Sequence, residues 1–221
     1  MMATKTGTNG KDSLYGTAQA DEIYGLRGND YLDGRGGDDL IDGGEHNDKI
    51  YGRDGWDELY GGAGNDEMYG GRHDDVMYGG NDNDKLNGEA DRDVLYGGRG
   101  DDTLNGGTED DELYGGFGND VLIGGGGYDT FYFFRNDSGA YPAGHDVIKD
   151  FQIGIDVINL ENLNLDGSPF SYVADDFTPA VGEWSFSMQG SDTFITWNDG
   201  TYHDVEVDNR TLTLSDFIFV A

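Results

Sequence analysis

Fourteen aspartates recur at intervals of nine residues between positions 12 and 129. Carboxylates at such regular spacing can hold divalent cations that prefer oxygen ligands, such as Ca²⁺. The chain has no cysteine, so a thiolate site for a soft metal is excluded. The candidate ligands are Asp12, Asp21, Asp30, Asp39, Asp48, Asp57, Asp66, Asp75, Asp84, Asp93, Asp102, Asp111, Asp120 and Asp129.

Each of these aspartates is the sixth residue of a nine-residue unit, and fourteen units cover residues 7–132 without an insertion. The first residue of every unit is glycine, and the eighth is always Leu, Ile, Met or Phe. Chance does not keep three positions in phase over 126 residues. The repeat is therefore the unit from which the fold is built.

The unit predicts a turn followed by a short strand. Its first six residues are rich in Gly, Asn and Asp, which favour turns because they accept positive φ. Its last three residues suit a strand whose eighth position points inward. Two units can close one coil of 18 residues, so the fourteen units predict an all-β solenoid of about seven coils, roughly 34 Å long.

The coil places aspartates side by side. Units on one side are two apart, so Asp66 is expected beside Asp48 and Asp84. Neighbouring carboxylates would lie ~5 Å apart and repel by about 3 kcal/mol per pair at an effective dielectric constant of 20. The core is only two facing rows of eighth-position side chains, too thin to offset twelve such pairs. A Ca²⁺ ion between the two carboxylates of each pair turns their repulsion into attraction to the ion. Mg²⁺ fits poorly because it demands tight octahedral geometry.

The composition excludes several classes of partner. The net charge is −32 with a sequence pI of about 4.1, which disfavours nucleic acid and anionic membranes. Up to twelve calcium ions would offset most of that charge. The N-terminus lacks the apolar segment of a secretory signal peptide, and no run of 18 apolar residues predicts a transmembrane helix.

The units match the pattern GGxGxDxUx and so resemble the calcium-binding parallel β-roll of RTX proteins. The resemblance implies that backbone carbonyls at the first and third positions of one turn, and at the second and fourth positions two units on, complete each ion with both aspartates. One such ion would join Gly61, Ala63 and Asp66 to Gly80, Asp82 and Asp84. An equivalent ion would join Gly97, Arg99 and Asp102 to Gly116, Gly118 and Asp120.

Several units depart from the pattern. The fourth position is not glycine at Gln19, His46, His73, Asp82, Asp91 and Glu109. One interpretation is that these side chains are extra ligands, with a transition-metal site at the histidines. The other is that they are turn residues, tolerated because the fourth position contributes only its backbone carbonyl and these residues accept unusual φ. The second position is not glycine in units one to four, six and ten, so we expect the N-terminal coils to bind calcium more weakly.

The ninth position is rich in tyrosine. In even-numbered units it is Tyr24, Asp42, Tyr60, Tyr78, Tyr96, Tyr114 and Tyr132. Such an exposed stripe could bind a sugar polymer or a partner. Alternatively, it is a cross-strand ladder that stiffens the sheet, or a surface covered by the C-terminal segment.

The repeat phase is lost after residue 132, which predicts a boundary between the β-roll at 7–132 and a small antiparallel β-domain at 133–221 that caps it. We expect strands at 144–151, 156–160, 183–188, 193–197, 201–207 and 215–220. The run HDVIKDFQIGIDVINL resembles the segment that follows the β-roll in serralysin-type proteases and in alginate epimerase R-modules. The ending SDFIFVA is similar to C-terminal signals for type I secretion, which implies a protein secreted by a Gram-negative bacterium.

No catalytic constellation is present: the sequence contains no HExxH, GxSxG or P-loop motif. We therefore expect a non-catalytic, extracellular calcium-binding module that folds after type I secretion. Two alternatives stay open. The chain could be an R-module-like polysaccharide-binding or adhesion module, or the C-terminal part of a larger secreted enzyme.

Overall fold

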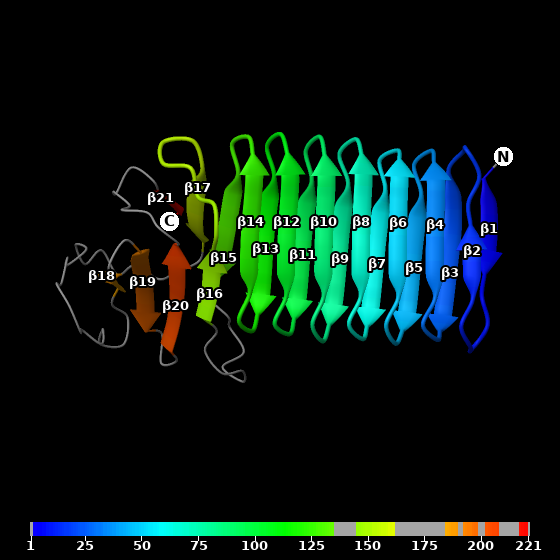
Figure 1. Cartoon of the computed structure of the whole chain (residues 1–221), viewed down its shortest axis with the longest axis horizontal. Helices are drawn as coiled ribbons and strands as arrows, with labels where there is room; N and C mark the ends of the chain where they lie inside the picture. The colour runs from blue at the N-terminus through cyan, green and yellow to red at the C-terminus, as the bar shows by residue number, and fades with distance from the viewer. Residues whose placement is uncertain are drawn as a thin grey trace.

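The structure is a computed structural model that describes residues 2–134, 145–161, 184–189, 192–198, 202–207 and 217–220. These residues form strands and turns arranged in two sheets (Figure 1). The first sheet has ten strands in the order β1-β3-β5-β7-β9-β11-β13-β15-β17-β21, and the second has eleven in the order β18-β19-β20-β16-β14-β12-β10-β8-β6-β4-β2.

The strands of the first sheet are β1 (Ala3–Thr6), β3 (Asp21–Arg27), β5 (Leu40–Glu45), β7 (Glu58–Ala63), β9 (Val76–Asn81), β11 (Val94–Arg99), β13 (Glu112–Phe117), β15 (Thr130–Phe134), β17 (Val157–Glu161) and β21 (Phe217–Val220). Those of the second are β2 (Ser13–Tyr15), β4 (Tyr31–Gly36), β6 (Lys49–Asp54), β8 (Glu67–Arg72), β10 (Lys85–Ala90), β12 (Thr103–Thr108), β14 (Val121–Gly126), β16 (His145–Ile148), β18 (Trp184–Gln189), β19 (Asp192–Asn198) and β20 (Tyr202–Val207).

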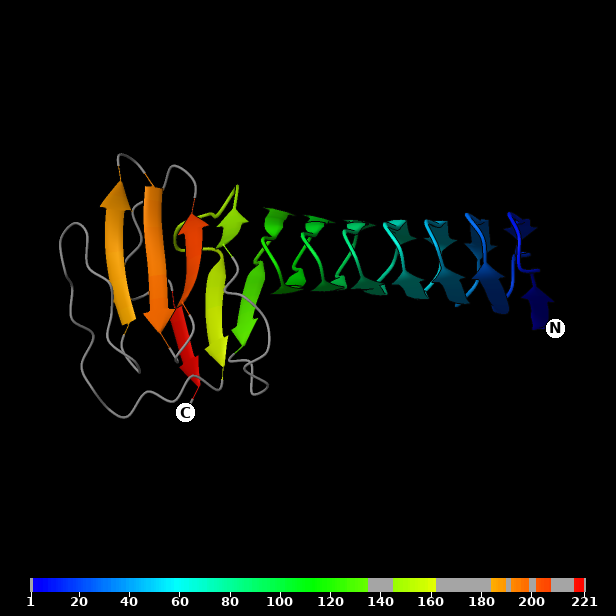
Figure 2. The same cartoon turned by 90° about the horizontal axis from the view of Figure 1, so that it is seen from below.

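Within the repeats, the chain crosses from one sheet to the other at every turn and so forms a parallel solenoid. Each strand pairs in parallel with the strand two further along, in a register of 18 residues that sets Leu59 opposite Met77. Figure 2 shows the two sheets as thin layers joined along both rims by turns. The predicted parallel roll with two units per coil is confirmed.

The strands are longer than the sequence predicted. Strands β5 to β14 each span six residues, namely the last three of one unit and the first three of the next, so the turn keeps only positions four to six. The second position has positive φ, as in Gly62 at 107°, and still stays in the ladder, where Gly62 pairs with Gly80. Positive φ therefore bends the strand without ending it.

The first position of each unit must be glycine because a side chain there would clash with neighbouring atoms. None of the fourteen has positive φ, although glycine was expected in the turn because it accepts positive φ at little cost; the second- and fourth-position glycines from Gly28 onward have it instead. A Cβ at Gly61 would instead lie 2.5 Å from Asp66 Oδ2 and 2.6 Å from the carbonyl oxygen of Gly79. The same conflict with the aspartate of the unit recurs at first positions along the roll. The first glycine thus makes room for the sixth-position carboxylate.

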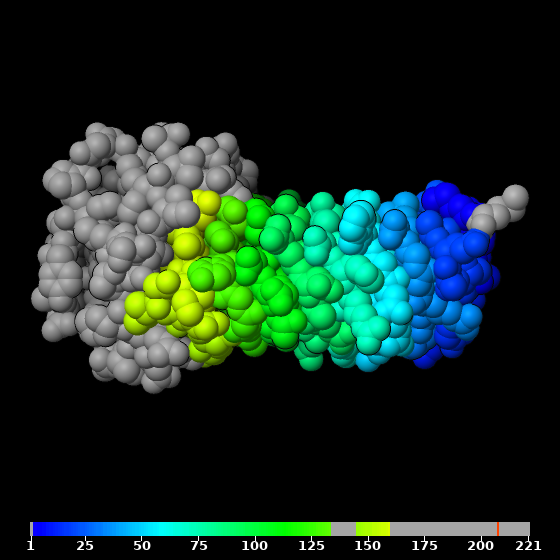
Figure 3. Space-filling model, turned by 90° about the horizontal axis from the view of Figure 1, so that it is seen from above, coloured from blue at the N-terminus to red at the C-terminus, as the bar shows by residue number. Residues whose placement is uncertain are grey.

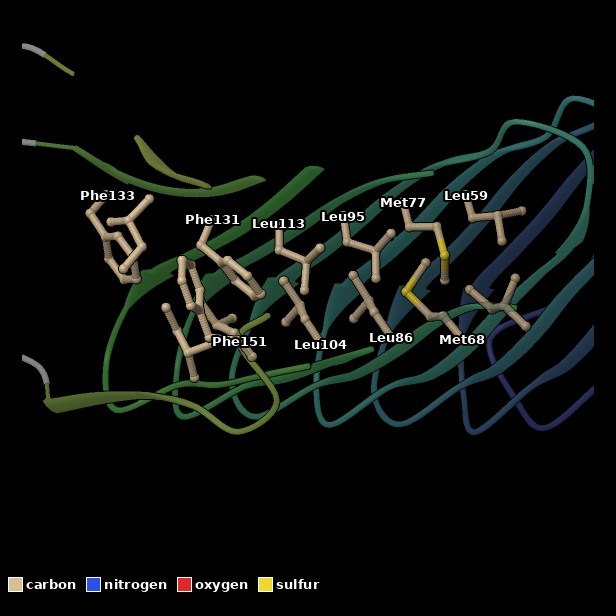
Figure 4. Packing of buried hydrophobic residues seen from close by; sticks show 14 of the residues in the cluster. Leu59, Met68, Met77, Leu86, Leu95, Leu104, Leu113, Phe131, Phe133 and Phe151 are labelled. Carbon is tan, nitrogen blue, oxygen red and sulfur yellow. The ribbon is translucent and has the colours of Figure 1, made fainter. Parts of the chain in front are cut away.

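The core is a double file of eighth-position side chains between the sheets (Figure 4). From Ile23 to Phe131 these residues are at most 2% exposed, whereas Leu14 is only partly buried. The same cluster continues through C-terminal residues Phe133, Ile148, Phe151, Ile158 and Val207. These five C-terminal residues therefore extend the core of the roll.

The C-terminal segment extends both sheets. All six predicted strands are present as β16 to β21, although residues 144, 183, 201, 215 and 216 at their predicted ends lie outside the described residues. The predicted antiparallel pairing is found between β18, β19 and β20. Strands β16, β17, β20 and β21, however, pair in parallel with the roll or with each other, so the stacking continues past residue 132. Figure 3 shows the segment around residues 145–160, in yellow, directly beside the green end of the repeats. The domain boundary at 132 stays a prediction.

The tight first position gives a direct test. We expect Gly61→Ala to lower the free energy of unfolding by about 1–3 kcal/mol, because the new methyl group must displace the Asp66 carboxylate or the next coil. Gly126→Ala is the matched control, since no atom lies within 4 Å of its Cβ. Chemical denaturation of both variants in calcium would contradict the steric argument if the two lost equal stability.

Candidate metal centre

Two rows of buried aspartates run along the rims of the roll. From Asp30 to Asp129 the sixth-position residues are at most 3% exposed. In each row, the backbone N–H of one aspartate donates to Oδ1 of the aspartate 18 residues later, as from Asp48 to Asp66 at 2.7 Å and from Asp66 to Asp84 at 2.8 Å. This ladder fixes one oxygen of each carboxylate and brings neighbours of a row together as predicted.

The second oxygen of each carboxylate has no protein partner. Oδ2 is buried and without a hydrogen bond in twelve residues: Asp30, Asp39, Asp48, Asp57, Asp66, Asp75, Asp84, Asp93, Asp102, Asp111, Asp120 and Asp129. Burying an ionised carboxylate without a compensating partner is strongly unfavourable, by several kcal/mol for each ion. Twelve repetitions of the same unmatched oxygen point to a cation that binds along each row.

Backbone carbonyls border the same spaces. The point that a Cβ of Gly61 would occupy lies close to both Asp66 Oδ2 and the Gly79 carbonyl, so a side-chain and a main-chain oxygen from adjacent coils face each other. Sequence reasoning missed the Gly79 carbonyl, because it placed the later coil's ligands at the second and fourth positions. Its proximity depends on how adjacent coils stack.

The predicted carbonyl ligands lie on neighbouring coils. Gly61 and Ala63 end β7, and Gly80 and Asp82 lie in β9 and directly after it. Gly97 and Arg99 belong to β11, and Gly116 and Gly118 lie in β13 and directly after it. The register sets Gly62 opposite Gly80 and Gly98 opposite Gly116. The assignment of these eight carbonyls to an ion stays a prediction.

The donor set suits a hard cation. In the part of the chain that the structure describes, no three side chains of His, Cys, Asp or Glu converge on one point. A cation in a row would therefore take carboxylates from two neighbouring aspartates and complete its shell with carbonyls. Ca²⁺ accepts six to eight such oxygens in flexible geometry, so the residues fit it.

Burial raises the pKa of the row aspartates far above the ordinary value. It reaches about 6 in Asp57, Asp120 and Asp129; about 7 in Asp39, Asp48, Asp66 and Asp102; about 8 in Asp75, Asp84 and Asp111; and about 9 in Asp93. In Asp93 burial is the main cause, and the charges of Asp75 and Asp111 add to it, while the Asp75 backbone hydrogen bond opposes it. Without a cation, the carboxyls whose pKa is about 7 to 9 stay at least half protonated near neutral pH.

At the N-terminal end of each row, a threonine donates hydrogen bonds to Oδ2 of the first aspartate; we call such an end closed. Thr8 donates to Asp12 Oδ2 from its backbone N–H at 2.6 Å and from its hydroxyl at 2.8 Å. The backbone N–H of Thr17 donates to Asp21 Oδ2 at 2.5 Å. Burial raises the pKa of Asp21, but hydrogen bonds from Thr17 and Ala3 outweigh it and leave that pKa lowered. Asp12 and Asp21 thus differ from the other predicted ligands.

One backbone angle accounts for this difference. From the third unit onward the second position has positive φ, even where it is Leu26, Arg35, Arg53 or Glu89. Thr8 and Thr17 occupy the same position with ordinary φ, and their N–H groups turn toward the aspartate four residues later. Units one and two therefore supply the donors that the other units lack.

The C-terminal end contains two aspartates that sequence reasoning missed. The backbone N–H of Asp120 donates to Asp146 Oδ1 at 2.9 Å, and that of Asp129 donates to Asp156 Oδ1 at 3.2 Å. The backbone N–H of Gln152 donates a hydrogen bond to Asp156 Oδ2 at 2.6 Å, so this oxygen has a partner. The signal was present in HDVI and IDVI, which keep the order of aspartate and apolar residue but follow at 26 and 27 residues instead of 18.

The fourth-position departures behave as turn residues. His46, His73, Asp82, Asp91 and Glu109 all have φ between 72° and 80°, whereas Gln19 does not have positive φ. In both histidines Nδ1 lies 2.8 Å from the carbonyl oxygen of the preceding residue. The two histidines lie on opposite rims, so the geometry favours tolerated turn residues over a shared metal site.

The tyrosine stripe of the first sheet is a closed stack. Ring centroids along Tyr60, Tyr78, Tyr96, Tyr114 and Tyr132 are 4.3 to 4.9 Å apart, with near-parallel planes. Each inner ring has both faces covered by its neighbours, so a sugar cannot stack on them. This arrangement favours the cross-strand ladder over the glycan-binding stripe.

Two family models match parts of this chain. Residues 95–219 match the family described as peptidase M10 serralysin C terminal, and residues 6–41, 34–68 and 69–104 match the RTX calcium-binding nonapeptide repeat. Among 35 matching chains of solved structures is the extracellular lipase LipA from Serratia marcescens, at 15% identity and a TM-score of 0.40 over 98% of this chain. This chain spans 40% of the lipase chain.

No curated protein matches the sequence. No helix in the described part of the chain is long and apolar enough to cross a membrane.

The raised pKa values predict the pH dependence of the metal-free fold. Row aspartates have folded pKa values of about 6 to 9, against an ordinary value of 3.8. The folded state thus binds more protons, and this contribution to stability is fully present below pH 4 and lost as pH rises through 6 to 9. We expect the chain in chelator to gain ordered structure on going from pH 8 to pH 5, measured by circular dichroism. More structure at pH 8 than at pH 5 would contradict the buried, unmatched carboxylates.

Proposed function

Because the chain belongs to the peptidase M10 serralysin C-terminal family and carries RTX calcium-binding nonapeptide repeats, we propose that it is a non-catalytic, extracellular module that folds when calcium binds between its coils. The observation that supports this most strongly is the pair of aspartate rows with twelve buried, unpartnered Oδ2 atoms. When bound, calcium supplies positive charge and bridging coordination at these oxygens.

The residues that would hold one ion come from adjacent coils. Asp66 and Asp84 contribute carboxylates to one site, and Asp102 and Asp120 contribute them to an equivalent one. The remaining ligands are carbonyls from the sets around β7 and β9 and around β11 and β13 described above. The ladder N–H groups hold Oδ1 of each aspartate, so that Oδ2 is left to face the ion.

The closed ends reduce the expected number of ions. Asp12 and Asp21 have their Oδ2 satisfied by Thr8 and Thr17, so each row keeps six open carboxylates. Six carboxylates form five neighbouring pairs, which gives ten ions in the two rows instead of twelve. Ten divalent ions would change the net charge from −32 to −12.

If folding requires calcium, the chain would fold only outside the cell, where calcium is abundant. Extracellular calcium modules bind at roughly 10⁻⁴–10⁻³ M, far above cytosolic levels, so the chain would stay unfolded before export. The proposed secretion signal at 215–221 includes β21, which pairs with β17 in the first sheet. Backbone pairing would compete with recognition of that segment, which favours export of the unfolded chain by a type I apparatus. Residues 215, 216 and 221 of the signal lie outside the described residues.

A second candidate is the C-terminal part of a larger secreted enzyme. The matching family describes the C-terminal part of M10 peptidases, which supports this alternative. The calcium-dependent folding of the module would be the same in that case.

The proposed function predicts a folding transition driven by calcium. At pH 7.5 in chelator we expect little β-structure by circular dichroism, and millimolar Ca²⁺ should restore it where equal Mg²⁺ does not. Asp84→Asn removes one carboxylate from two neighbouring sites and should bind one or two fewer ions by equilibrium dialysis. Asp101→Asn is the control: it removes the same charge on the same rim and places asparagine where Asn83 and Asn119 already lie. A chain that is folded in chelator at neutral pH would refute the proposal.

The threonine closures predict the ion count. Thr8→Gly combined with Thr17→Gly converts both units to the second-position residue of eight other units, which allows positive φ. We expect up to two additional calcium ions by equilibrium dialysis, because Asp12 and Asp21 lose their donors. Thr108→Gly, at a third position, should leave the count unchanged. A count that is the same in all three proteins would show that threonine does not limit the array.

A further inference from the structure

The residue before each row aspartate, at the fifth position of the unit, forms a second ladder along the rims. Its backbone N–H donates to the side chain of the fifth residue one coil earlier, as from Asn65 to Asn47 Oδ1 at 3.2 Å. The aspartate ladder runs the other way, from Asp66 to Asp84. A turn with both bonds is therefore held to the coil before it and to the coil after it. We call the bond at the fifth position the turn bond.

The two rims differ in how completely they carry the turn bond. On the rim of the odd-numbered units it runs without a gap from Asn47 to His145, whereas on the rim of the even-numbered units it joins only alternate pairs of coils. The donors and acceptors, 2.9 to 3.2 Å apart, are Asn65 to Asn47, Asn83 to Asn65, Asp101 to Asn83, Asn119 to Asp101 and His145 to Asn119 on the odd rim, and Trp56 to Asp38, Arg92 to Asp74 and Tyr128 to Asp110 on the even rim.

The gaps on the even rim follow from residue type. Trp56 and Arg92 have side chains without an acceptor oxygen, so they cannot accept the N–H groups of Asp74 and Asp110. Both side chains are exposed, with Trp56 at 65%, so neither of them serves the core. The even rim therefore repeats over two coils, although the aspartate row beside it repeats over one.

The turn bond joins the same two turns that an ion of the row would bridge. An ion between Asp66 and Asp84 would take oxygens from turns whose fifth residues, Asn65 and Asn83, are already bonded to each other. Of the ten sites proposed above, seven have the turn bond. Among the described residues, the three sites without it are those between Asp30 and Asp48, between Asp57 and Asp75, and between Asp93 and Asp111.

We propose that the fifth-position residues divide the calcium sites into seven tighter and three weaker ones, and that the weaker ions leave while the roll is still folded. A site whose turns are already joined loses less conformational freedom when the ion binds, so it binds more tightly. One hydrogen bond changes an equilibrium constant by a factor of roughly two to ten. This inference rests on the proposed function, because it assigns affinities to the same ions.

The fold can survive the loss of a weaker ion on the even rim. The site between Asp57 and Asp75 lies between two sites that have the turn bond, namely Asp39 with Asp57 and Asp75 with Asp93. Each carboxylate of the weaker site would therefore keep a second ion when the shared one leaves. The same holds for the site between Asp93 and Asp111, which is followed by the bonded turns of Asp110 and Tyr128.

The test counts bound ions by equilibrium dialysis at decreasing free calcium, with circular dichroism of the same samples. We expect about three ions to leave before the β-structure falls, one for each site without a turn bond. Trp56→Asn combined with Arg92→Asn supplies the two missing acceptors and should lower this number to about one. The variant should fold, because both side chains are exposed.

Tyr128→Asn is the matched control. It replaces an exposed aromatic residue at the same position, at 67% against 65% for Trp56. The corresponding residue of the next coil is Ile155, whose N–H already donates to the Gln152 carbonyl oxygen at 3.0 Å, so no turn bond can form. The number of ions that leave early should therefore stay the same.

The reverse change removes a turn bond. Asn83→Ala takes away the acceptor of the Asp101 N–H and should add one ion to those that leave early. Asn83→Asp should restore the original number, because Asp101 accepts the N–H of Asn119 in the same ladder. Hydrogen exchange of the Asp101 amide gives an independent readout, with faster exchange in Asn83→Ala and renewed protection in Asn83→Asp.

The inference and the proposed function fail in different ways. The inference is overturned if all ions leave together with the β-structure, if the double variant releases as many early ions as the unaltered chain, or if Tyr128→Asn lowers the number equally. In each of these cases a chain that unfolds in chelator still supports the proposed function. A chain that stays folded after every ion has left refutes the proposed function, and the order in which its ions leave still tests the inference.

Discussion

The structure depends on burying two rows of like-charged carboxylates at the interval of one coil. Each aspartate gives one oxygen to the backbone of the preceding coil, and this ladder locks the register of the rim. The other oxygen is left buried without a partner in twelve residues. The first-position glycine exists to leave room for that carboxylate, as the contacts around Gly61 show. These oxygens are the feature on which the proposed calcium-dependent folding rests.

The thin core explains why the missing charge matters so much. One apolar side chain per unit lines the interior, so each coil buries little hydrophobic surface beyond its immediate neighbours. Stacked repeats gain stability mainly from nearest-neighbour contacts, and here those contacts include the carboxylate repulsion. Both ends of the array differ, because Thr8, Thr17 and Gln152 supply the hydrogen bonds that the middle lacks. The buried carboxylate oxygens without a partner thus lie between Asp30 and Asp129.

The two faces of the roll use the same tyrosine position differently. On the first sheet the rings from Tyr60 to Tyr132 cover one another and form a closed stack. On the second sheet Tyr15 and Tyr51 lie beneath the guanidinium groups of Arg35 and Arg53. The difference comes from the second-position residue, which is glycine over most of the first sheet and arginine at two coils of the second. A repeat can therefore carry a distinct surface without any change to its core.

The sequence alone determined the coil of 18 residues, the two aspartate rows and the apolar double file, because a strict period of nine leaves one way to bury the eighth position. It also indicated the hard-cation chemistry, since no thiolate ligand exists in the chain. Only the tertiary structure decided which carboxylates stay open. That depends on the φ angle at one residue, as in Thr17, and on how the irregular spacing to Asp146 and Asp156 is absorbed by stacking. The threonine bond lies within one unit but forms only with the ordinary φ that the structure shows there, and the pairing of Asp146 and Asp156 is set by contacts between coils.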